Sequence, residues 1–333
     1  RRCRISAARL SIIREYSRMT AHKKETALTI TVIIPAYKPG EPFRKLIRRL
    51  MRQTVLPDRI LIINTEEPYF HPEDVEGIQN CRVIHISREE FDHGGTRDMA
   101  VRMCDTDLVL CMTMDAVPAD ARLLEELRKA FADSRVWAAY ARQLPAPDCS
   151  PLERYARHFN YGEKSRIKTE KDLEELGIKT FFCSNVCAAY RRDMYLKLGG
   201  FETRTIFNED MIFAGKVILA GGAVAYCAEA RVIHSHNYSG IMQFKRNFDL
   251  GVSQADHPEI FEMAKSEKEG MRMVGQTAAW LLKSGRLLWI PRLIWQSGCK
   301  LAGYRLGKAY RRLPSWIIRR CSMNLPYWTR KQE

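Results

Sequence analysis

The chain has 333 residues, of which 46% are hydrophobic and 28% are charged. These are ordinary values for a folded protein, and they exclude a disordered or fibrous chain. No stretch reaches the ~18 apolar residues of a membrane-spanning helix, and the first residues lack the apolar core of a signal peptide, so we expect neither segment. The length predicts two domains, or one α/β domain with an appendage.

The net charge of +15 is concentrated in the two ends of the chain. Residues 1–27 have a net charge of +6 and residues 241–333 have one of +10, whereas residues 28–240 have one of −1. This distribution predicts a basic N-terminal extension, a near-neutral central domain and a basic C-terminal region. Such flanks favour a polyanionic partner, either nucleic acid or the anionic face of a membrane.

The ten cysteines predict reduced thiols rather than disulfides or a zinc site. The sequence has no CxxC pair of the kind that a structural zinc site uses, and the spacings indicate no disulfide framework. We therefore expect an intracellular protein with buried thiols.

The first half of the central domain predicts a doubly wound α/β sheet. Aliphatic and β-branched runs alternate with helical patterns, an order that is typical of a mostly parallel sheet covered by helices. Ligands of such sheets bind beyond the carboxyl ends of the strands. The predicted strands cover 29–36, 59–63, 82–86 and 107–112, and the predicted helices cover 42–53, 95–104 and 119–132.

The second half is predicted to continue the sheet and then to become helical. Residues 150–180 are polar and are predicted to form helix and loop over a site, and the pattern beyond Ser239 is wholly helical. Between these stretches we expect a buried strand over 181–190, helices over 191–198 and 209–220, and two short strands within 223–234.

Asp115 follows the fourth predicted strand in the sequence Thr113-Met114-Asp115-Ala116. A carboxylate at the carboxyl end of a strand points toward the ligand crevice, where it can hold Mg²⁺ or Mn²⁺ on a diphosphate. The alternative is an aspartate that caps the next helix, which is a common role.

The segment from His93 to Arg97 joins a loop to the start of a helix. Gly94 and Gly95 would let the backbone approach a ligand closely, and Arg97 can pair with a phosphate. Nucleotidyltransferases also have a GGTR string, but theirs follows the first strand. A tight turn without a ligand is the structural alternative.

Two further pairs of residues can carry chemistry. Glu209 and Asp210 begin a helix, where the helix dipole alone favours acidic residues, but one of them could be a general base for a hydroxyl nucleophile. His234 and His236 end a strand, and their spacing places both imidazoles on one face, as a metal or phosphate site requires. Without a ligand, they would be ordinary surface or core histidines.

Taken in chain order, these motifs resemble the family 2 glycosyltransferases of the GT-A fold, in particular the bacterial rhamnosyltransferases that build cell-surface polysaccharides. The resemblance extends over nearly all of 28–328. It implies a GT-A catalytic domain over 28–240 and a helical appendage over 241–333. The resembling segments are TVIIPAYKPG (31–40), IINTE (62–66), FDHGGTRD (91–98), TMDAVPAD (113–120), GGFETRTIFNEDMIFAGKVILAGG (199–222), ARVIHSHNYS (230–239) and LAGYRLGKAYRRLP (301–314).

The resemblance implies an inverting transfer of a sugar, with dTDP-β-L-rhamnose as the expected donor and a glycan or lipid-linked glycan hydroxyl as the acceptor. UDP-glucose, UDP-galactose or another nucleotide sugar is the alternative donor. The family's first loop lies beside the nucleotide base, its second contacts base or ribose, and its third lies near the diphosphate. The matching residues of this chain, together with Met114 of the metal motif, are Pro35, Ala36, Tyr37, Glu66, His93, Gly94, Gly95 and Arg97.

The same resemblance assigns a divalent cation, Mg²⁺ or Mn²⁺, and a catalytic base. Asp115 matches the carboxylate of the DXD-type metal motif, and His234 matches a later histidine that often completes the coordination, with His236 close by. Asp210 matches the catalytic base, with Glu209 beside it.

The sequence departs from the family pattern at three positions. Thr113 stands where the first aspartate of a DXD motif would be, and Met114 stands where the rhamnosyltransferases often have glutamine. One carboxylate instead of two predicts weaker metal retention, with the diphosphate supplying other ligands. Asp98 stands where relatives often have asparagine, and a carboxylate there could pair with Arg97 and alter the sugar preference.

The segment 271–296 mixes three tryptophans and several leucines with Lys283, Arg286 and Arg292. This composition is typical of a helix that lies on anionic lipid. We therefore expect a cytoplasmic protein that docks peripherally on the inner face of the plasma membrane. The alternative is an appendage that packs on the catalytic domain or on a second subunit of a homo-oligomer.

Two other classes of function compete with a transferase. A basic nucleic-acid-binding protein would explain the charge, but the basic residues lie in the flanks and the chain has no recognisable DNA- or RNA-binding motif, so we expect no nucleic acid partner. A nucleotide-binding scaffold without catalysis would explain Thr113 in the metal motif.

Overall fold

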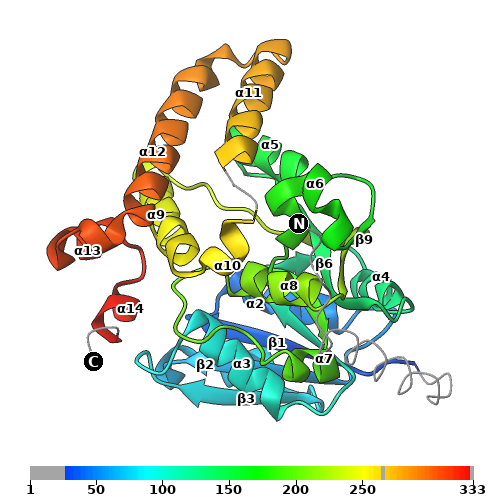
Figure 1. Ribbon diagram of the computed structural model, residues 1–333. Coiled ribbons are helices and arrows are strands. Elements are labelled where there is room, and N and C mark those ends of the chain that lie inside the picture. Colours follow the sequence, from blue (N-terminus) through cyan, green and yellow to red (C-terminus); the bar gives the residue numbers. More distant parts are fainter. Residues whose placement is uncertain (1–26, 264–266, 331–333) are drawn as a thin grey trace.

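The aliphatic runs of the sequence form one mixed sheet at the base of the molecule (Figure 1). The structure, a computed structural model, describes residues 27–263 and 267–330, so the predicted N-terminal extension lies outside the described residues except for Ala27. The strand order is β3-β2-β1-β4-β8-β6-β9-β5, and β7 pairs with β9. The strands are β1 (Ile30–Tyr37), β2 (Arg59–Thr65), β3 (Cys81–Ile86), β4 (Leu108–Met112), β5 (Val117–Pro118), β6 (Val136–Leu144), β7 (Arg166–Lys168), β8 (Cys187–Arg191) and β9 (Ala223–Ile233).

The half of the sheet formed by β3, β2, β1 and β4 is parallel, as the α/β pattern predicts. In the other half, β8 runs antiparallel to both β4 and β6, whereas β6 and β9 are parallel. The carboxyl ends of β4, β6 and β9 consequently meet at one edge of the sheet. This edge holds the candidate site.

Three local predictions for the second half of the sheet are wrong or incomplete. The strand predicted over 181–190 begins only at Cys187, because residues 177–181 form a short 3₁₀ helix. The two strands expected within 223–234 are one strand, β9, which changes its register against β6 between Ala141 and Arg142. Strand β6 was not predicted, since its sequence VWAAYARQL is rich in alanine, which has little preference for strands.

Helices cover both faces of the sheet. One face packs against α2 and α4, and the other packs against α3, α7 and α8. In α2 the spacing of Phe43, Leu46, Ile47 and Leu50 places all four side chains in the core, each worth about 1.5–3 kcal/mol when fully buried. The helices of this part are α2 (Glu41–Leu50), α3 (His93–Met103), α4 (Leu123–Ala130), α5 (Pro151–Asn160), α6 (Leu173–Leu176), α7 (Arg192–Lys197) and α8 (Glu209–Leu219).

The described residues beyond Ser239 are helical, as predicted. Helices α11 and α12 project from the body as a long hairpin, and α13 and α14 lie to one side of α9 (Figure 1). The helices of this region are α9 (Gly240–Asp256), α10 (Pro258–Phe261), α11 (Glu267–Lys283), α12 (Ile290–Lys308), α13 (Ser315–Cys321) and α14 (Leu325–Arg330).

Glycines bring α9 and α12 into close contact. A Cβ atom added at Gly307 would lie 2.1 Å from the carbonyl oxygen of Phe248 on α9, and one at Gly303 would lie 2.1 Å from that of Phe244. No real Cβ atom approaches an oxygen so closely, so the two backbones can touch only because these positions lack side chains.

We expect Gly307→Ala to lower the free energy of unfolding by about 1–3 kcal/mol, because the helices must separate to admit the methyl group. Gly298→Ala is the matched control on the same helix, since nothing lies within 4 Å of its added Cβ. That control should be neutral or stabilising by about 0.4–1 kcal/mol. Urea denaturation of both variants measures the difference, and equal stabilities would contradict the packing argument.

Candidate active site

A cavity of about 410 Å³ lies at the edge of the sheet where β4, β6 and β9 end. Its floor contains Thr113, which follows β4, and Gln143 near the end of β6. Helices α5 and α8 contribute further wall residues, and α9, α11 and α12 close the cavity from the C-terminal region. The predicted residues that line it are His93, Arg97, Glu209, Asp210, His234 and His236.

Asp115, His234 and His236 form one cluster at this cavity. Their potential ligand atoms all lie within 4.8 Å of one another. The Nε2 atoms of His234 and His236 are 3.6 and 3.4 Å from the carboxylate oxygens of Asp115. Burial lowers the pKa of His234 to about 3, so its imidazole is neutral, as a metal ligand must be. One carboxylate and two imidazoles thus offer three potential ligand atoms to a divalent cation.

Gln143 fixes His234 from behind. Its side-chain oxygen lies 3.1 Å from Nδ1 of His234, so this nitrogen donates the hydrogen bond and Nε2 keeps its lone pair toward Asp115. The same oxygen accepts a bond from Arg157, and the amide nitrogen of Gln143 donates to the hydroxyl of Ser184. Sequence reasoning missed Gln143 because it missed β6. The signal that the sequence offered was a glutamine near the end of an alanine-rich run, and the structure shows that this glutamine is buried.

Glu209 and Asp210 begin α8 and are held differently. The carboxylate of Glu209 lies 3.4 Å from the guanidinium of Arg97 and accepts a hydrogen bond from the side-chain amide of Asn185. The carboxylate of Asp210 accepts bonds from the backbone nitrogens of Asn185 and Met211, at 2.9 and 2.8 Å. Asn185 therefore holds both acids, and it is a second residue that sequence reasoning missed.

The two acids differ in their readiness to take a proton. Burial alone would raise the pKa of Glu209, but the charge of Arg97, together with His93 and the hydrogen bond from Asn185, keeps it below its ordinary value. Burial, together with the negative charge of Glu209, raises the pKa of Asp210 to about 7. Asp210 can accordingly accept a proton near neutral pH, which is what a general base requires.

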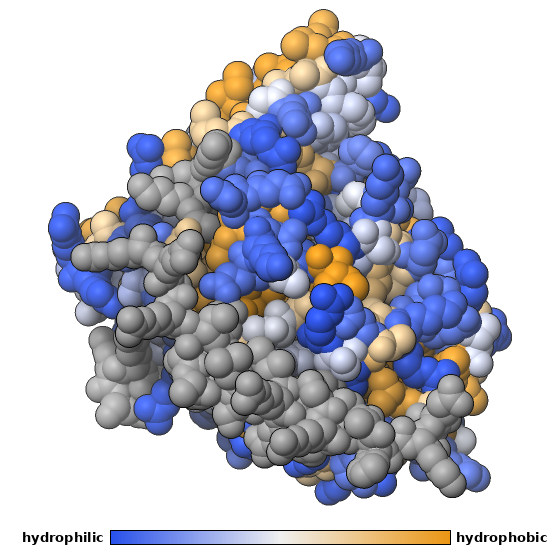
Figure 2. All heavy atoms as spheres, turned by 45° about the vertical axis from the view of Figure 1, so that its right-hand side comes forward, coloured by the Kyte–Doolittle hydropathy of each residue, from blue (hydrophilic) through white to orange (hydrophobic). Residues whose placement is uncertain are grey.

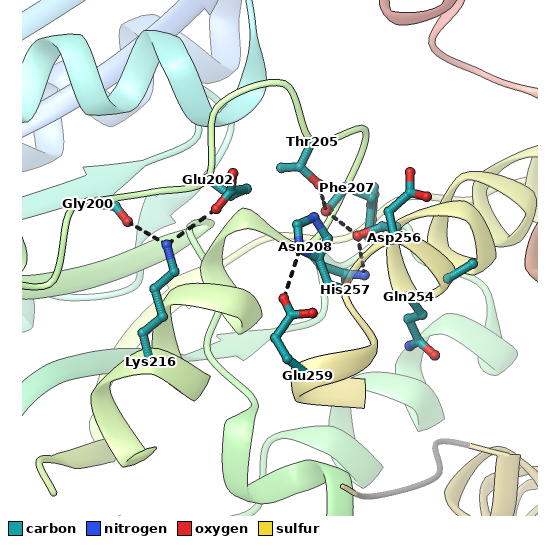
Figure 3. Close-up of polar contacts among 12 residues, drawn as sticks. Gly200, Glu202, Thr205, Phe207, Asn208, Lys216, Gln254, Asp256, His257 and Glu259 are labelled. Carbon is teal, nitrogen blue, oxygen red and sulfur yellow. Dashed lines mark hydrogen bonds and ion pairs between the residues drawn. The ribbon is translucent and has the colours of Figure 1, made fainter. Parts of the chain in front are cut away.

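The loop before these acids is anchored to α9 (Figure 3). The hydroxyl of Ser253 on α9 donates to the carbonyl oxygen of Phe207 at 2.6 Å and accepts a bond from the amide of Asn208 at 3.2 Å. Thr205 donates to the same carbonyl oxygen. Asn208 has a left-handed backbone with φ of 66°, which turns the chain sharply into α8. The backbone that carries Asp210 therefore depends on a contact with the C-terminal region.

The glycines of the 93–97 segment serve packing rather than close approach to the cavity. A Cβ atom at Gly94 would lie 2.0 Å from the carbonyl oxygen of Glu202, and the backbone nitrogen of Gly95 donates to the side chain of Asp92, which caps α3. Neither glycine lines the cavity, whereas His93 and Arg97 do. Both glycines lie in the first turn of α3, where local packing without a ligand is sufficient to explain them.

Asp98 does not pair with Arg97. Its carboxylate binds Arg102 at 2.6 Å and accepts a hydrogen bond from the hydroxyl of Tyr195 at 2.9 Å. Arg97 instead donates to the carbonyl oxygen of His93 and faces Glu209. The suggested influence of Asp98 on the sugar through Arg97 is therefore wrong.

The residues predicted beside the nucleotide base lie on the other side of Asp115. Glu66 lines a separate cavity of about 460 Å³ together with Tyr69, whose ring packs edge-on against that of Tyr37. The backbone nitrogen of Tyr37 lies 3.4 Å from the sulfur of Met114, which links this region to the metal motif. Pro35 and Ala36 lie within β1 and do not line either cavity.

The family model for "Glycosyl transferase family 2" matches residues 31–199. The chain belongs to glycosyl transferase family 2. It is 40% identical over 307 residues to the O-antigen chain rhamnosyltransferase RfbN of Salmonella typhimurium, and the aligned region covers 92% of this chain and 98% of that protein. It is also 40% identical over 310 residues to the O-antigen chain rhamnosyltransferase WbaN of Salmonella anatum, and that aligned region covers 91% of this chain and 97% of WbaN.

Solved structures share the fold of this family member at low identity. The mannosyltransferase PcManGT of Pyrobaculum calidifontis, in complex with GDP-Man and Mn²⁺, matches with a TM-score of 0.57 at 16% identity, over 90% of this chain and 94% of that chain. Residues 1–349 of S. aureus TarS match with a TM-score of 0.51 at 14% identity, over 86% and 92%. The predicted GT-A fold and the predicted glycosyltransferase are thereby confirmed.

Proposed function

We propose that this glycosyltransferase transfers L-rhamnose from dTDP-β-L-rhamnose, with inversion, to a hydroxyl of a glycan during the synthesis of a cell-surface polysaccharide. The observation that carries the proposal is Asp210, whose pKa is raised to about 7 and which lines the same cavity as His234 and His236, the two histidines that cluster with Asp115. The names of the relatives RfbN and WbaN support rhamnose as the sugar.

The proposed reaction is a direct displacement. Asp210 takes the proton of the acceptor hydroxyl while the oxygen forms a bond to the anomeric carbon of the sugar. The bond between that carbon and the diphosphate oxygen breaks, and its electron pair leaves with the diphosphate. Attack from the face opposite the leaving group inverts the configuration. Glu209 is held by Arg97 and Asn185, and its negative charge contributes to the raised pKa of Asp210, which makes Asp210 a stronger base.

The leaving group needs positive charge, and the residues of the cavity can hold a cation that supplies it. Asp115, His234 and His236 would hold Mg²⁺ or Mn²⁺, which would offset the charge that develops on the diphosphate. The complex of PcManGT with GDP-Man and Mn²⁺ supports a divalent cation in this fold. The hydroxyl of Thr113 is buried and has no hydrogen-bond partner among the described residues, which fits a ligand atom beside the cluster.

A thermal-shift screen with dTDP-rhamnose, UDP-glucose and UDP-galactose, each with Mg²⁺ and with Mn²⁺, tests the donor. A ligand at 100 times its Kd stabilises the native state by about 2.7 kcal/mol, so the true donor should raise Tm clearly. We expect dTDP-rhamnose to give the largest shift and its dTDP to be released when an acceptor is present. If only the UDP-hexoses raise Tm, the donor is a UDP-hexose and the rhamnose proposal is wrong. If no donor is turned over, the result favours a nucleotide-binding scaffold without catalysis.

We also propose that the C-terminal region, residues 241–333, brings the catalytic domain, residues 28–240, to the cytoplasmic face of the plasma membrane, where a lipid-linked acceptor is found. Among the described helices, none is long and apolar enough to cross a membrane. The end of the α11–α12 hairpin instead exposes apolar side chains beside hydrophilic ones (Figure 2), with Leu282 and Leu287 both 58% exposed and Leu288 94% exposed. Residues 270–332 contain thirteen basic and no acidic residues, which suits an anionic surface.

Floating the protein on vesicles that contain phosphatidylglycerol tests this docking. We expect the native chain to float at low salt and the variant with Leu287→Ser and Leu288→Ser to bind at least ~10-fold more weakly, because two exposed leucines lose their contact with lipid. A matched control is Leu56→Ser, which removes an exposed leucine before β2, 52% exposed. Equal flotation of both variants, or no binding of the native chain, would contradict the proposal.

A further inference from the structure

The wall of the active-site cavity that comes from the C-terminal region carries two cations. Arg246 of α9 and Lys300 of α12 both line the cavity. Arg246 lies over the rings of Phe207 and Tyr238, with its guanidinium carbon 4.6 and 5.8 Å from the ring centres. These two aromatic rings keep the guanidinium at the cavity.

Other cations of the cavity already have carboxylate partners. Arg97 faces Glu209 at 3.4 Å, and Arg157 pairs with Glu153 at 2.6 Å. Among the described side chains, neither Arg246 nor Lys300 has a carboxylate at ion-pair distance, although Asp249 acts on Arg246 and Glu153 acts on Lys300 from farther away. The cavity therefore holds a surplus of positive charge on its helical side, which a neutral ligand would leave uncompensated.

A second cavity of about 320 Å³ adjoins the first at Arg246. The two cavities share Phe207 and Met273 as well as Arg246, and the second one continues between α9 and α11 along side chains such as Ile178 and Leu250. A ligand that extends from Asp210 past Arg246 would thus pass from a polar space into a more apolar one.

We propose that Arg246 and Lys300 form a phosphate-binding subsite on the helical wall of the cavity. A guanidinium and an ammonium group are the side chains that proteins use to bind phosphate, and their bonds to it are stronger where water is scarce. The inference rests on the proposed function, because it takes the reaction to lie in this cavity.

Two ligands could bring a phosphate to this place. One is the diphosphate of the donor, and the other is the phosphate that joins a glycan acceptor to its lipid. The acceptor is the expected ligand, since Arg246 lines the second, more apolar cavity as well as the first. The phosphate chemistry is common to both ligands, and binding measurements separate them.

The experiment measures two affinities on the full chain in excess Mg²⁺. Titration with dTDP reports the donor side, and titration of the dTDP-saturated protein with farnesyl diphosphate reports the acceptor side. The variants are Arg246→Gln and Lys300→Gln. Lys245→Gln is the matched control, because Lys245 neighbours Arg246 on α9 but does not line the cavity and acts on Cys321 of α13 instead. Thermal unfolding verifies that each variant folds.

We expect each of the two variants to bind farnesyl diphosphate about tenfold more weakly and to change the affinity for dTDP less than about twofold. Arg246→Lys should restore part of the lost affinity for farnesyl diphosphate. A tenfold loss for dTDP instead would keep the subsite and assign it to the donor. Affinities equal to those of Lys245→Gln for both ligands, or a native protein that binds neither, would overturn the subsite. If the donor screen selects a UDP-sugar, UDP replaces dTDP, so failure of the rhamnose proposal remains distinguishable from failure of this one.

Discussion

Replacement of Asp210 by asparagine should reduce kcat by about 10²–10⁴-fold, because the acceptor hydroxyl then has no base to take its proton. The Kd for the nucleotide sugar should stay within about twofold, since the amide keeps the size of the carboxylate and its oxygen can still accept one of the two backbone hydrogen bonds that Asp210 receives. Asp193→Asn, the same chemical change at the exposed start of α7, is the control. Turnover of the Asp210 variant close to that of the control would refute the assignment.

The acid limb of the pH–rate profile gives an independent measure of the same residue. A base must be deprotonated to act, and the pKa of Asp210 is raised to about 7, so kcat should fall about tenfold for each pH unit below 7. Part of this rise comes from the charge of Glu209. Glu209→Gln should therefore lower the pKa of Asp210 and move the acid limb to lower pH. An unchanged limb would indicate that another group titrates.

The second large effect is expected at Asp115. Asp115→Ala removes the only carboxylate of the cluster, and we expect the protein to bind Mn²⁺ at least ~100-fold more weakly, as measured by the electron paramagnetic resonance of the free ion. Asp148→Ala, at an exposed aspartate after β6, is the control. An unchanged Mn²⁺ affinity would place the cation elsewhere.

Gln143→Ala gives a graded test of the same centre. Gln143 touches His234 through Nδ1 and would not touch the ion, so its loss should weaken Mn²⁺ binding by about 10–100-fold and leave some activity. A loss as complete as that of Asp115→Ala would mean that Gln143 is needed for more than the orientation of His234.

The family resemblance predicted that Asp115, His234 and His236 share one metal site, and the strand patterns placed Asp115 and His234 after predicted strands. Asp115 follows the aliphatic run of β4 after two further residues, His234 comes directly after β9, and the carboxyl ends of these strands lie at one edge of the sheet. Their proximity depends only on the topology of an α/β sheet. A different signal, the helical pattern of residues 209–220 with acidic residues in its first turn, placed Glu209 and Asp210 at the start of a helix.

The residues that position these groups could not be predicted. Gln143 lies in an alanine-rich strand without a clear strand pattern, and Asn185 lies in the turn before β8, where the sequence instead predicted an unbroken strand. Their importance comes from contacts across the fold, such as the two bonds from Asn185 to Glu209 and Asp210. The role of Gly94 was likewise set by a distant neighbour, the carbonyl oxygen of Glu202.

The anchoring of the base segment to α9 has a consequence for the order in which the enzyme matures on the ribosome. Strands β1 to β9 are complete once residue 233 has been synthesised, but the contacts of Phe207 and Asn208 with Ser253 require a helix that is made later. The glycine contacts then join α9 to α12, which is made later still. We therefore expect transfer to begin only after both α9 and α12 have been made.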